Sequence, residues 1–218
     1  MPVSFDAYHR AHLAPSEAGR LTDEIDPVVP DSCWIAGAVA SIAARTPRRV
    51  PEMIRTLEDG RLALRYYRLE PSADGTLAYD ERLHPTNWRE QDLAKHGWYR
   101  FVERSVIDMM PHRGGQPSDV HNLLLGRKHR MVPLVSRGAI ERLQAALSAP
   151  QVEALPVLAT RPQVQPPFVP EHAYLVVAEA RIDGQPAFRL RDAVTREELV
   201  ATHEELLANG ASVSLSDR

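Results

Sequence analysis

Apolar and polar positions alternate along the chain in patterns that predict its helices. The stretch Cys33–Ala44 carries no charge and has small residues on every side, so it predicts a helix that runs buried through the middle of a domain. Pro30-Asp31-Ser32 precedes this helix, and Arg45-Thr46-Pro47 ends it. Apolar residues at helical spacing predict three further helices, over Trp98–Met110, Pro117–Leu125 and Ser136–Leu147.

Other segments have the composition of strands. Leu62–Leu69 predicts a strand, Asp74-Gly75 a hairpin turn and Leu77–Tyr79 the returning strand. Near the C-terminus, two strands are expected on either side of a turn at Asp183-Gly184, and they are Ala173–Ala178 and Phe188–Arg191. A final helix is expected over Thr195–Asn209, ending at Gly210.

Six prolines between Pro150 and Pro170 exclude a regular helix there. This segment predicts an extended crossing between two lobes, with one strand at Val157–Thr160. Helices first and strands later predict an α+β protein. The expected parts are an N-terminal arm (1–29) with a short helix near Ser16–Asp26, a helical lobe (30–149), and a Pro-rich crossing followed by a β-rich lobe (150–218).

Composition narrows the class of protein. The chain of 218 residues has 44% hydrophobic and 25% charged residues, which is ordinary for a globular protein. A net charge of −3 provides no basic field for a phosphate backbone, so we expect no nucleic-acid partner. The longest apolar stretch is too short to span a bilayer, and the N-terminus lacks the pattern of a secretory signal. The expectation is a cytoplasmic protein, or one exported without a classical signal peptide.

The metal-binding residue types do not form a pattern that predicts a metal or other cofactor. A single cysteine, Cys33, excludes an internal disulfide and a zinc site built on thiolates. The nine histidines show no zinc-helix spacing, and His112, His121 and His129 fall in a polar region that predicts surface positions. No acidic cluster has the pattern of a calcium site.

Cys33 is the candidate nucleophile. A cysteine at a helix N-terminus faces unpaired N–H groups and the positive end of the helix dipole, and both favour the reactive thiolate. The same N–H groups could stabilise the oxyanion of a tetrahedral intermediate. The alternative is a buried cysteine that acts as a small apolar side chain.

Two further residues complete a candidate triad. His172 begins a predicted strand roughly 140 residues after Cys33, an interval typical of papain-type Cys/His pairs. Asp192 ends the next predicted strand, where its carboxylate could orient the imidazole. Alternatively, His172 lies at a solvent-exposed strand edge, and Asp192 pairs with Arg189 or Arg191 or caps a helix near Thr195.

Six segments, in order along residues 30 to 195, resemble motifs of the calpain catalytic domain. Pro30-Asp31-Ser32-Cys33-Trp34-Ile35-Ala36 resembles the active-site helix Gly-Asp-Cys-Trp-Phe-Leu-Ala-Ala. The other five segments are Ala78–Thr86 (similar to Val-Asp-Asp-Arg-Leu-Pro-Thr), Phe101–Val106 with Gly114-Gly115, Leu123–Gly126, His172-Ala173-Tyr174 (His-Ala-Tyr) and Arg189–Asp192 (Arg-Asn-Pro-Trp-Gly, with Asp for Asn).

This resemblance implies a papain-like cysteine protease fold and a calpain-like cysteine protease that acts on protein or peptide substrates. Its catalytic residues would be Cys33, His172 and Asp192, with aspartate orienting the histidine as asparagine does in the family. Ser32, Trp34 and Gln116 are expected at the cleft or the oxyanion site, with Trp34 as an apolar wall.

Two features depart from the family pattern. Pro27 stands where calpains carry an oxyanion-hole glutamine, and Gln116 is the candidate substitute. Ala193-Val194-Thr195 replaces Pro-Trp-Gly after the third triad residue. The sequence therefore leaves two alternatives open: a catalytically inactive calpain-like binding module, and a cysteine-dependent transglutaminase or deamidase of the kind found in toxin domains.

Overall fold

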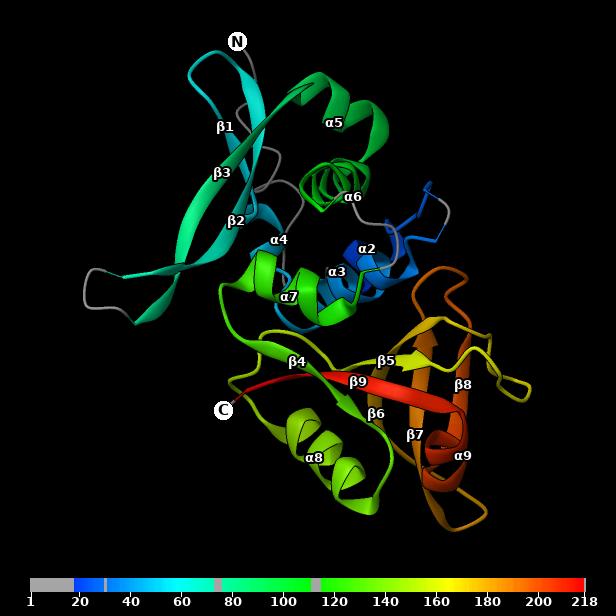
Figure 1. Cartoon of the computed structure of the whole chain (residues 1–218). Coiled ribbons are helices and arrows are strands. Elements are labelled where there is room, and N and C mark those ends of the chain that lie inside the picture. The colour runs from blue at the N-terminus through cyan, green and yellow to red at the C-terminus, as the bar shows by residue number, and fades with distance from the viewer. Residues whose placement is uncertain (1–17, 30, 73–75, 111–114, 218) are drawn as a thin grey trace.

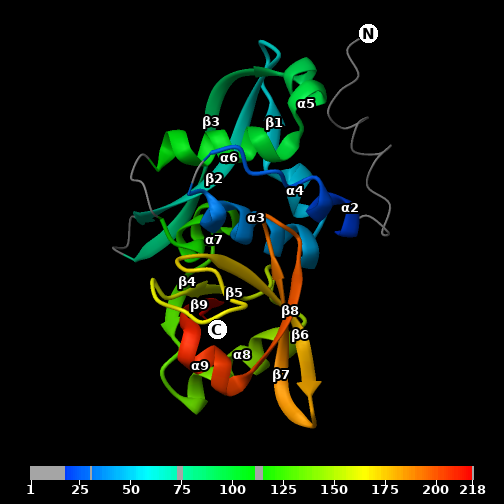
Figure 2. The same cartoon turned by 90° about the vertical axis from the view of Figure 1, so that its right-hand side faces the viewer.

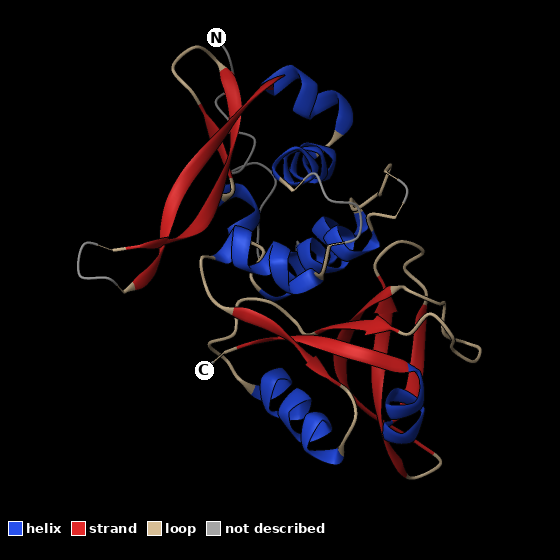
Figure 3. Cartoon of the chain, viewed as in Figure 1, coloured by secondary structure: helices blue, strands red, loops and turns tan. Residues whose placement is uncertain are grey.

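The chain folds into a mixed α+β structure with two antiparallel sheets, as expected for the α+β class (Figure 1). The computed structural model describes residues 18–29, 31–72, 76–110 and 115–217, and within these ranges it contains eight helices. The N-terminal elements form one half of the molecule, and the second sheet with its two helices forms the other (Figure 3).

The first half combines helices with a three-stranded sheet in the order β1-β2-β3. Its elements are α2 (Ala18–Asp23), α3 (Cys33–Arg45), α4 (Arg49–Glu52), β1 (Ile54–Thr56), β2 (Arg61–Pro71), β3 (Leu77–Arg89), α5 (Glu90–His96), α6 (Trp98–Met109) and α7 (Pro117–Leu125). The returning strand is longer than the predicted Leu77–Tyr79, because its pairing with β2 continues as far as Arg89. The turn expected at residues 74–75 lies outside the described residues.

The second half is a six-stranded antiparallel sheet in the order β4-β9-β5-β6-β7-β8. Its elements are β4 (His129–Pro133), α8 (Arg137–Ser148), β5 (Val157–Thr160), β6 (Ala173–Ile182), β7 (Gln185–Asp192), β8 (Glu198–Thr202), α9 (His203–Asn209) and β9 (Gly210–Ser216). The helix predicted over Thr195–Asn209 is wrong in its first half. Residues 198–202 instead pair with β7, and Thr202 caps a shorter helix by accepting a hydrogen bond from the Glu205 N–H.

The division of the chain also differs from the expected one. Strand β4 pairs with β9, and α8 packs its Ile140 and Leu143 into the core of the second half. The β-rich half therefore begins near residue 129, rather than after residue 149. The end of the expected N-terminal arm is likewise part of the first core, since Leu21 and Ile25 are buried there.

Helix α3 lies between the two halves and is buried along most of its length (Figure 2). Its small residues permit close contact with the second sheet: a Cβ on Gly37 would lie 3.0 Å from Val157 and 3.2 Å from Ala173. The first four residues of β6 are buried on both faces, with Leu175 in the core around α3 and Val176 in the core beneath the sheet. No described helix, α3 included, has both the length and the apolar character needed to cross a membrane.

Candidate active site

Cys33 is the first residue of α3 and is half-buried. The carbonyl oxygen of Ser32 accepts hydrogen bonds from the N–H groups of Ile35 and Ala36, at 2.9 and 3.0 Å. The N–H groups of Cys33 and Trp34 therefore stand ahead of the helical ladder, at the positive end of the helix dipole. The sulfur lies 3.8 Å from the carbonyl oxygen of Glu171, which precedes His172.

His172 directly precedes β6, and its backbone is fixed to the end of β5. Its N–H donates to the hydroxyl of Thr160 at 2.8 Å, and its carbonyl accepts from the Thr160 N–H at 2.9 Å. The imidazole Nε2 lies 2.9 Å from Oδ2 of Asp192, and the ring packs edge-on against Tyr174 at 5.1 Å. The neighbouring thiol of Cys33 helps to raise the pKa of His172, so the imidazole is influenced by both the sulfur and the carboxylate.

Asp192 is buried at the end of β7 and uses both of its carboxylate oxygens. Oδ2 faces His172, while Oδ1 accepts the N–H groups of Val194 at 2.7 Å and Thr195 at 3.0 Å. Asp192 therefore contacts His172 and caps the turn after β7 at the same time. The neighbouring Arg191 pairs with Asp23 and not with Asp192. An asparagine would place its NH₂ group against a donor on one of these two sides, so aspartate and asparagine are not equivalent here.

The electrostatics of the pair favour an imidazolium. Burial lowers the pKa of His172, but the hydrogen bonds and charges of Asp192 and Cys33 outweigh burial and raise it to about 9. Burial raises the pKa of Asp192, but His172 and the N–H groups of Val194 and Thr195 lower it further than burial raises it. At neutral pH the imidazole is therefore protonated beside an ionised carboxylate.

Cys33 and His172 line a cleft of about 910 Å³, here named the Cys33 cleft, while Asp192 is buried and is not part of its lining. Trp34, Gln116 and Pro27 line it. Trp34 is 8% exposed and packs so tightly on Gly115 that a Cβ there would lie 2.5 Å from the indole ring. Trp34 and Gln116 therefore both border this cleft, and their expected roles, as an apolar wall and as a substitute oxyanion donor, stay predictions.

Ser32 is not available as a side-chain donor to an oxyanion. Its hydroxyl is buried and donates to Oε1 of Glu103 at 2.6 Å, and Tyr99 donates to the same oxygen at 3.2 Å. The other oxygen of Glu103 accepts the Val28 N–H at 3.4 Å. Sequence reasoning missed Glu103, a buried carboxylate that anchors the loop before Cys33. The available signal was its position four residues after Tyr99, among the apolar positions of α6.

The predicted surface position is wrong for His121 and His129, which are both buried, while His112 lies outside the described residues. His121 bridges the hydroxyls of Ser41 and Ser214, at 2.7 and 2.9 Å. Because the Ser41 hydroxyl donates to the Ala38 carbonyl, Nε2 of His121 carries the proton. The network therefore joins α3, α7 and β9.

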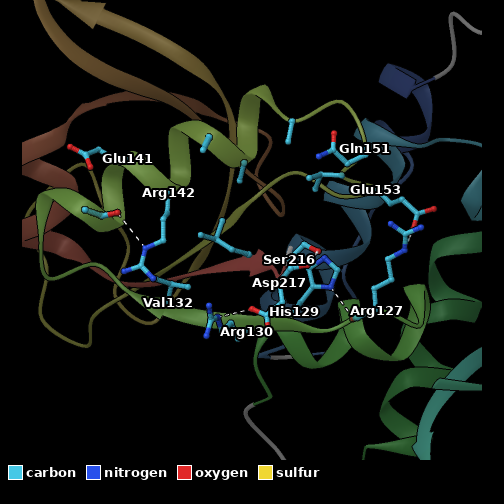
Figure 4. A pocket seen from close by; sticks show the side chains of 16 residues that line it. Arg127, His129, Arg130, Val132, Glu141, Arg142, Gln151, Glu153, Ser216 and Asp217 are labelled. Atoms are coloured by element: carbon cyan, nitrogen blue, oxygen red, sulfur yellow. Dashed lines mark hydrogen bonds and ion pairs between the residues drawn. The ribbon is translucent and has the colours of Figure 1, made fainter. Parts of the chain in front are cut away.

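His129 lines a second pocket, of about 940 Å³, between β4, α8 and the C-terminal strand (Figure 4). This pocket shares no lining residue with the Cys33 cleft. Within the part of the chain that the structure describes, no group of three or more His, Cys, Asp or Glu residues is arranged to hold a metal ion.

No protein-family model matches the sequence, and a search of curated proteins finds no match to it.

Proposed function

We propose that the chain is a thiol-dependent hydrolase with a papain-like fold, a calpain-like cysteine protease whose triad is Cys33, His172 and Asp192. One observation supports the proposal most strongly: the imidazole of His172 pairs with the carboxylate of Asp192 and lines the same cleft as the thiol of Cys33, which helps to raise the pKa of His172. Cys33 is the first residue of α3, His172 directly precedes β6, and Asp192 is the last residue of β7, so all three lie at the ends of elements. The order of roles, nucleophile, base and orienting carboxylate, is that of a cysteine hydrolase triad.

In the proposed reaction the Cys33 thiolate attacks the carbonyl carbon of a peptide bond. The His172 imidazolium then donates its proton to the leaving amine, and an acyl-enzyme remains. Water, deprotonated by the neutral imidazole, attacks the acyl group and releases the free carboxylate and the thiol. Asp192 holds the ring in one orientation and stabilises its charged form.

The N–H of Cys33 at the start of α3 is the proposed main-chain donor to the oxyanion. Gln116 supplies the proposed side-chain donor, because it lines the cleft where Pro27 offers no amide. Its backbone is held by a hydrogen bond from its N–H to Asp119 at 3.1 Å.

The experiment compares the parent protein with Cys33→Ala and His172→Ala. We expect iodoacetamide to alkylate the parent thiol rapidly at pH 7, and at least roughly tenfold more slowly in His172→Ala, because the imidazolium is lost. A mixture of unstructured peptides should be cleaved by the parent only, with products identified by mass spectrometry.

The products distinguish the proposal from its alternatives. Shorter peptides with free carboxyl ends support hydrolysis, whereas addition of a supplied primary amine to glutamine side chains would indicate acyl transfer. Slow alkylation in the parent, equal to that in His172→Ala and without any product, would identify an inactive binding module and refute the proposal.

A further inference from the structure

Two acidic residues stand directly beside the proposed catalytic pair. Asp31 lies two residues before Cys33, and Glu171 lies one residue before His172. Both side chains are exposed and both residues line the Cys33 cleft. The backbone of Glu171 reaches the reactive atom itself, since its carbonyl oxygen lies 3.8 Å from the sulfur.

The backbone at both acids is unusual. Asp31 has φ +63° and Glu171 has φ +49°, in the left-handed region that non-glycine residues seldom occupy. Among the described residues only Asp183 and Arg196 share this feature outside glycine, and Asp183 lies in the β6–β7 hairpin turn, where such angles are common. Strained residues of this kind concentrate at functional sites.

Negatively charged side chains outnumber positively charged ones among the described residues that line the cleft. Neither Asp31 nor Glu171 forms an ion pair within the described ranges, and no described lysine or arginine lines the cleft. Among the lining residues that the structure describes, the one cation is the His172 imidazolium, which pairs with the carboxylate of Asp192. The two exposed carboxylates therefore give the described part of the cleft an excess of negative charge.

The remaining walls are largely apolar. They include Val29, Met131, Pro162, Pro170 and Val194. Arginine and lysine carry a cationic head on an aliphatic stem, so they match a site whose walls are apolar and whose free charges are negative. An acidic side chain would meet like charge, and a short neutral one would leave both carboxylates without a partner.

We infer that the Cys33 cleft selects substrates with an arginine or lysine side chain next to the bond that is cleaved, with Asp31 and Glu171 as the residues that bind the cationic head. The substrate preference in this inference rests on the proposed protease function. The charge selectivity itself is a property of the cleft and can be measured without any turnover.

The first test measures that selectivity at the thiol. Cys33 is the only cysteine of the chain, so every thiol modification reports on this cleft. The probes are two methanethiosulfonates of similar size, one carrying a trimethylammonium group and the other a sulfonate, and the rates are followed by mass spectrometry. We expect the double variant Asp31→Asn/Glu171→Gln to lower the ratio of cationic to anionic rates by roughly fivefold or more.

Asp183→Asn is the matched control, because it neutralises an exposed aspartate that also has positive φ but lies in a hairpin turn outside the cleft. It should leave the ratio of rates unchanged. Since His172 is present in all three proteins, its charge cancels from the comparison. An equal ratio in the parent and the double variant overturns the inference.

The second test uses peptides that differ at one residue beside the scissile bond: arginine, its uncharged analogue citrulline, or glutamate. We expect kcat/KM in the parent to be roughly tenfold or more higher for arginine than for citrulline, and the double variant to lose this difference. Cleavage without charge preference refutes the inference and leaves the protease function standing. If no peptide is cleaved but the thiol reagents show the cationic preference, the protease function fails and the selectivity of the cleft stands.

Discussion

Among the residues of the candidate active site, Asp192 has the most specific set of hydrogen-bond partners. Its two oxygens accept three hydrogen bonds, one from His172 and two from the N–H groups of Val194 and Thr195. The carboxylate is therefore both the partner of the imidazole and the cap of the turn after β7. These two tasks require acceptors on both sides, which a carboxylate provides and an amide does not.

This geometry predicts that Asp192→Asn lowers the proposed protease activity about as much as Asp192→Ala. In either variant the imidazole loses its orienting acceptor or the turn loses its cap, and we expect kcat to fall roughly 10²-fold or more with little change in KM. Steady-state kinetics on a cleaved peptide measure both values. An Asp192→Asn enzyme that retains most of the parental rate would show that asparagine can replace the carboxylate after all.

The same pair predicts the pH dependence of activity and stability. Because the pKa of His172 is raised from 6.5 to about 9, the ion pair is complete below pH 6.5 and is lost as the pH rises through 9. We expect kcat/KM of the parent to decline with an alkaline limb near pH 9, and the contribution of the pair to stability to decline over the same range. In Asp192→Ala the alkaline decline of kcat/KM should occur at lower pH. A decline at the same pH as in the parent would show that another group causes it.

At the scale of elements, the contact between Trp34 and Gly115 joins the start of α3 to the segment before α7. A methyl group on Gly115 would overlap the indole, so Gly115→Ala must displace the wall of the cleft. We expect a loss of about 1–3 kcal/mol in the free energy of unfolding, together with a lower rate of peptide cleavage. Denaturant titration and kinetics measure the two effects.

Gly138→Ala, in α8, serves as the control, because a Cβ there meets only the Ser136 hydroxyl oxygen, at 3.9 Å. It should keep or raise stability, since alanine favours a helix over glycine. Adding Gly115→Ala to Trp34→Ala should cost little beyond Trp34→Ala alone, because the overlap is gone. Equal losses in both backgrounds would place the effect of Gly115 elsewhere.

At the scale of the whole molecule, a buried polar network joins the two halves through His121. Burial and the neighbouring His129 lower the pKa of His121 well below 6.5, so the folded protein holds it neutral between Ser41 and Ser214. The unfolded chain binds this proton more readily than the folded one. The stabilisation is therefore complete above pH 6.5 and is lost as the pH falls below it.

We expect His121→Gln, which keeps a donor and an acceptor but does not titrate, to reduce the pH dependence of stability. The melting temperature of the parent should fall more between pH 7.5 and 5.5 than that of the variant. Calorimetry at the two pH values measures this difference. An identical fall in both proteins would show that other groups govern the acid response.

The sequence alone predicted the helix of Cys33 and the hairpin that carries His172 and Asp192. The uncharged run at Cys33–Ala44 indicates a buried helix, and Ala173–Ala178 with Phe188–Arg191 indicates a hairpin, so the ends of these elements, with the three candidate triad residues, could be predicted. Local periodicity suffices for such elements, because their hydrogen bonds and buried faces repeat within a few residues.

The tertiary structure decided whatever depends on partners distant in sequence. The residues 198–202 have a helical pattern but form a strand, because β7 offers a free edge. His121 and Glu103 are polar residues that are buried, and side chains from distant parts of the chain, Ser214 and Ser32, form hydrogen bonds with them. His129 is also buried, although its ring bonds only to the Arg127 carbonyl nearby. Packing between distant segments also gives Asp192 its two tasks. It likewise brings Asp31 and Glu171 to one cleft, without an ion pair to either among the described residues. Packing between elements decides which side chains come into contact. The spacing of residues along one segment gives no information about such contacts.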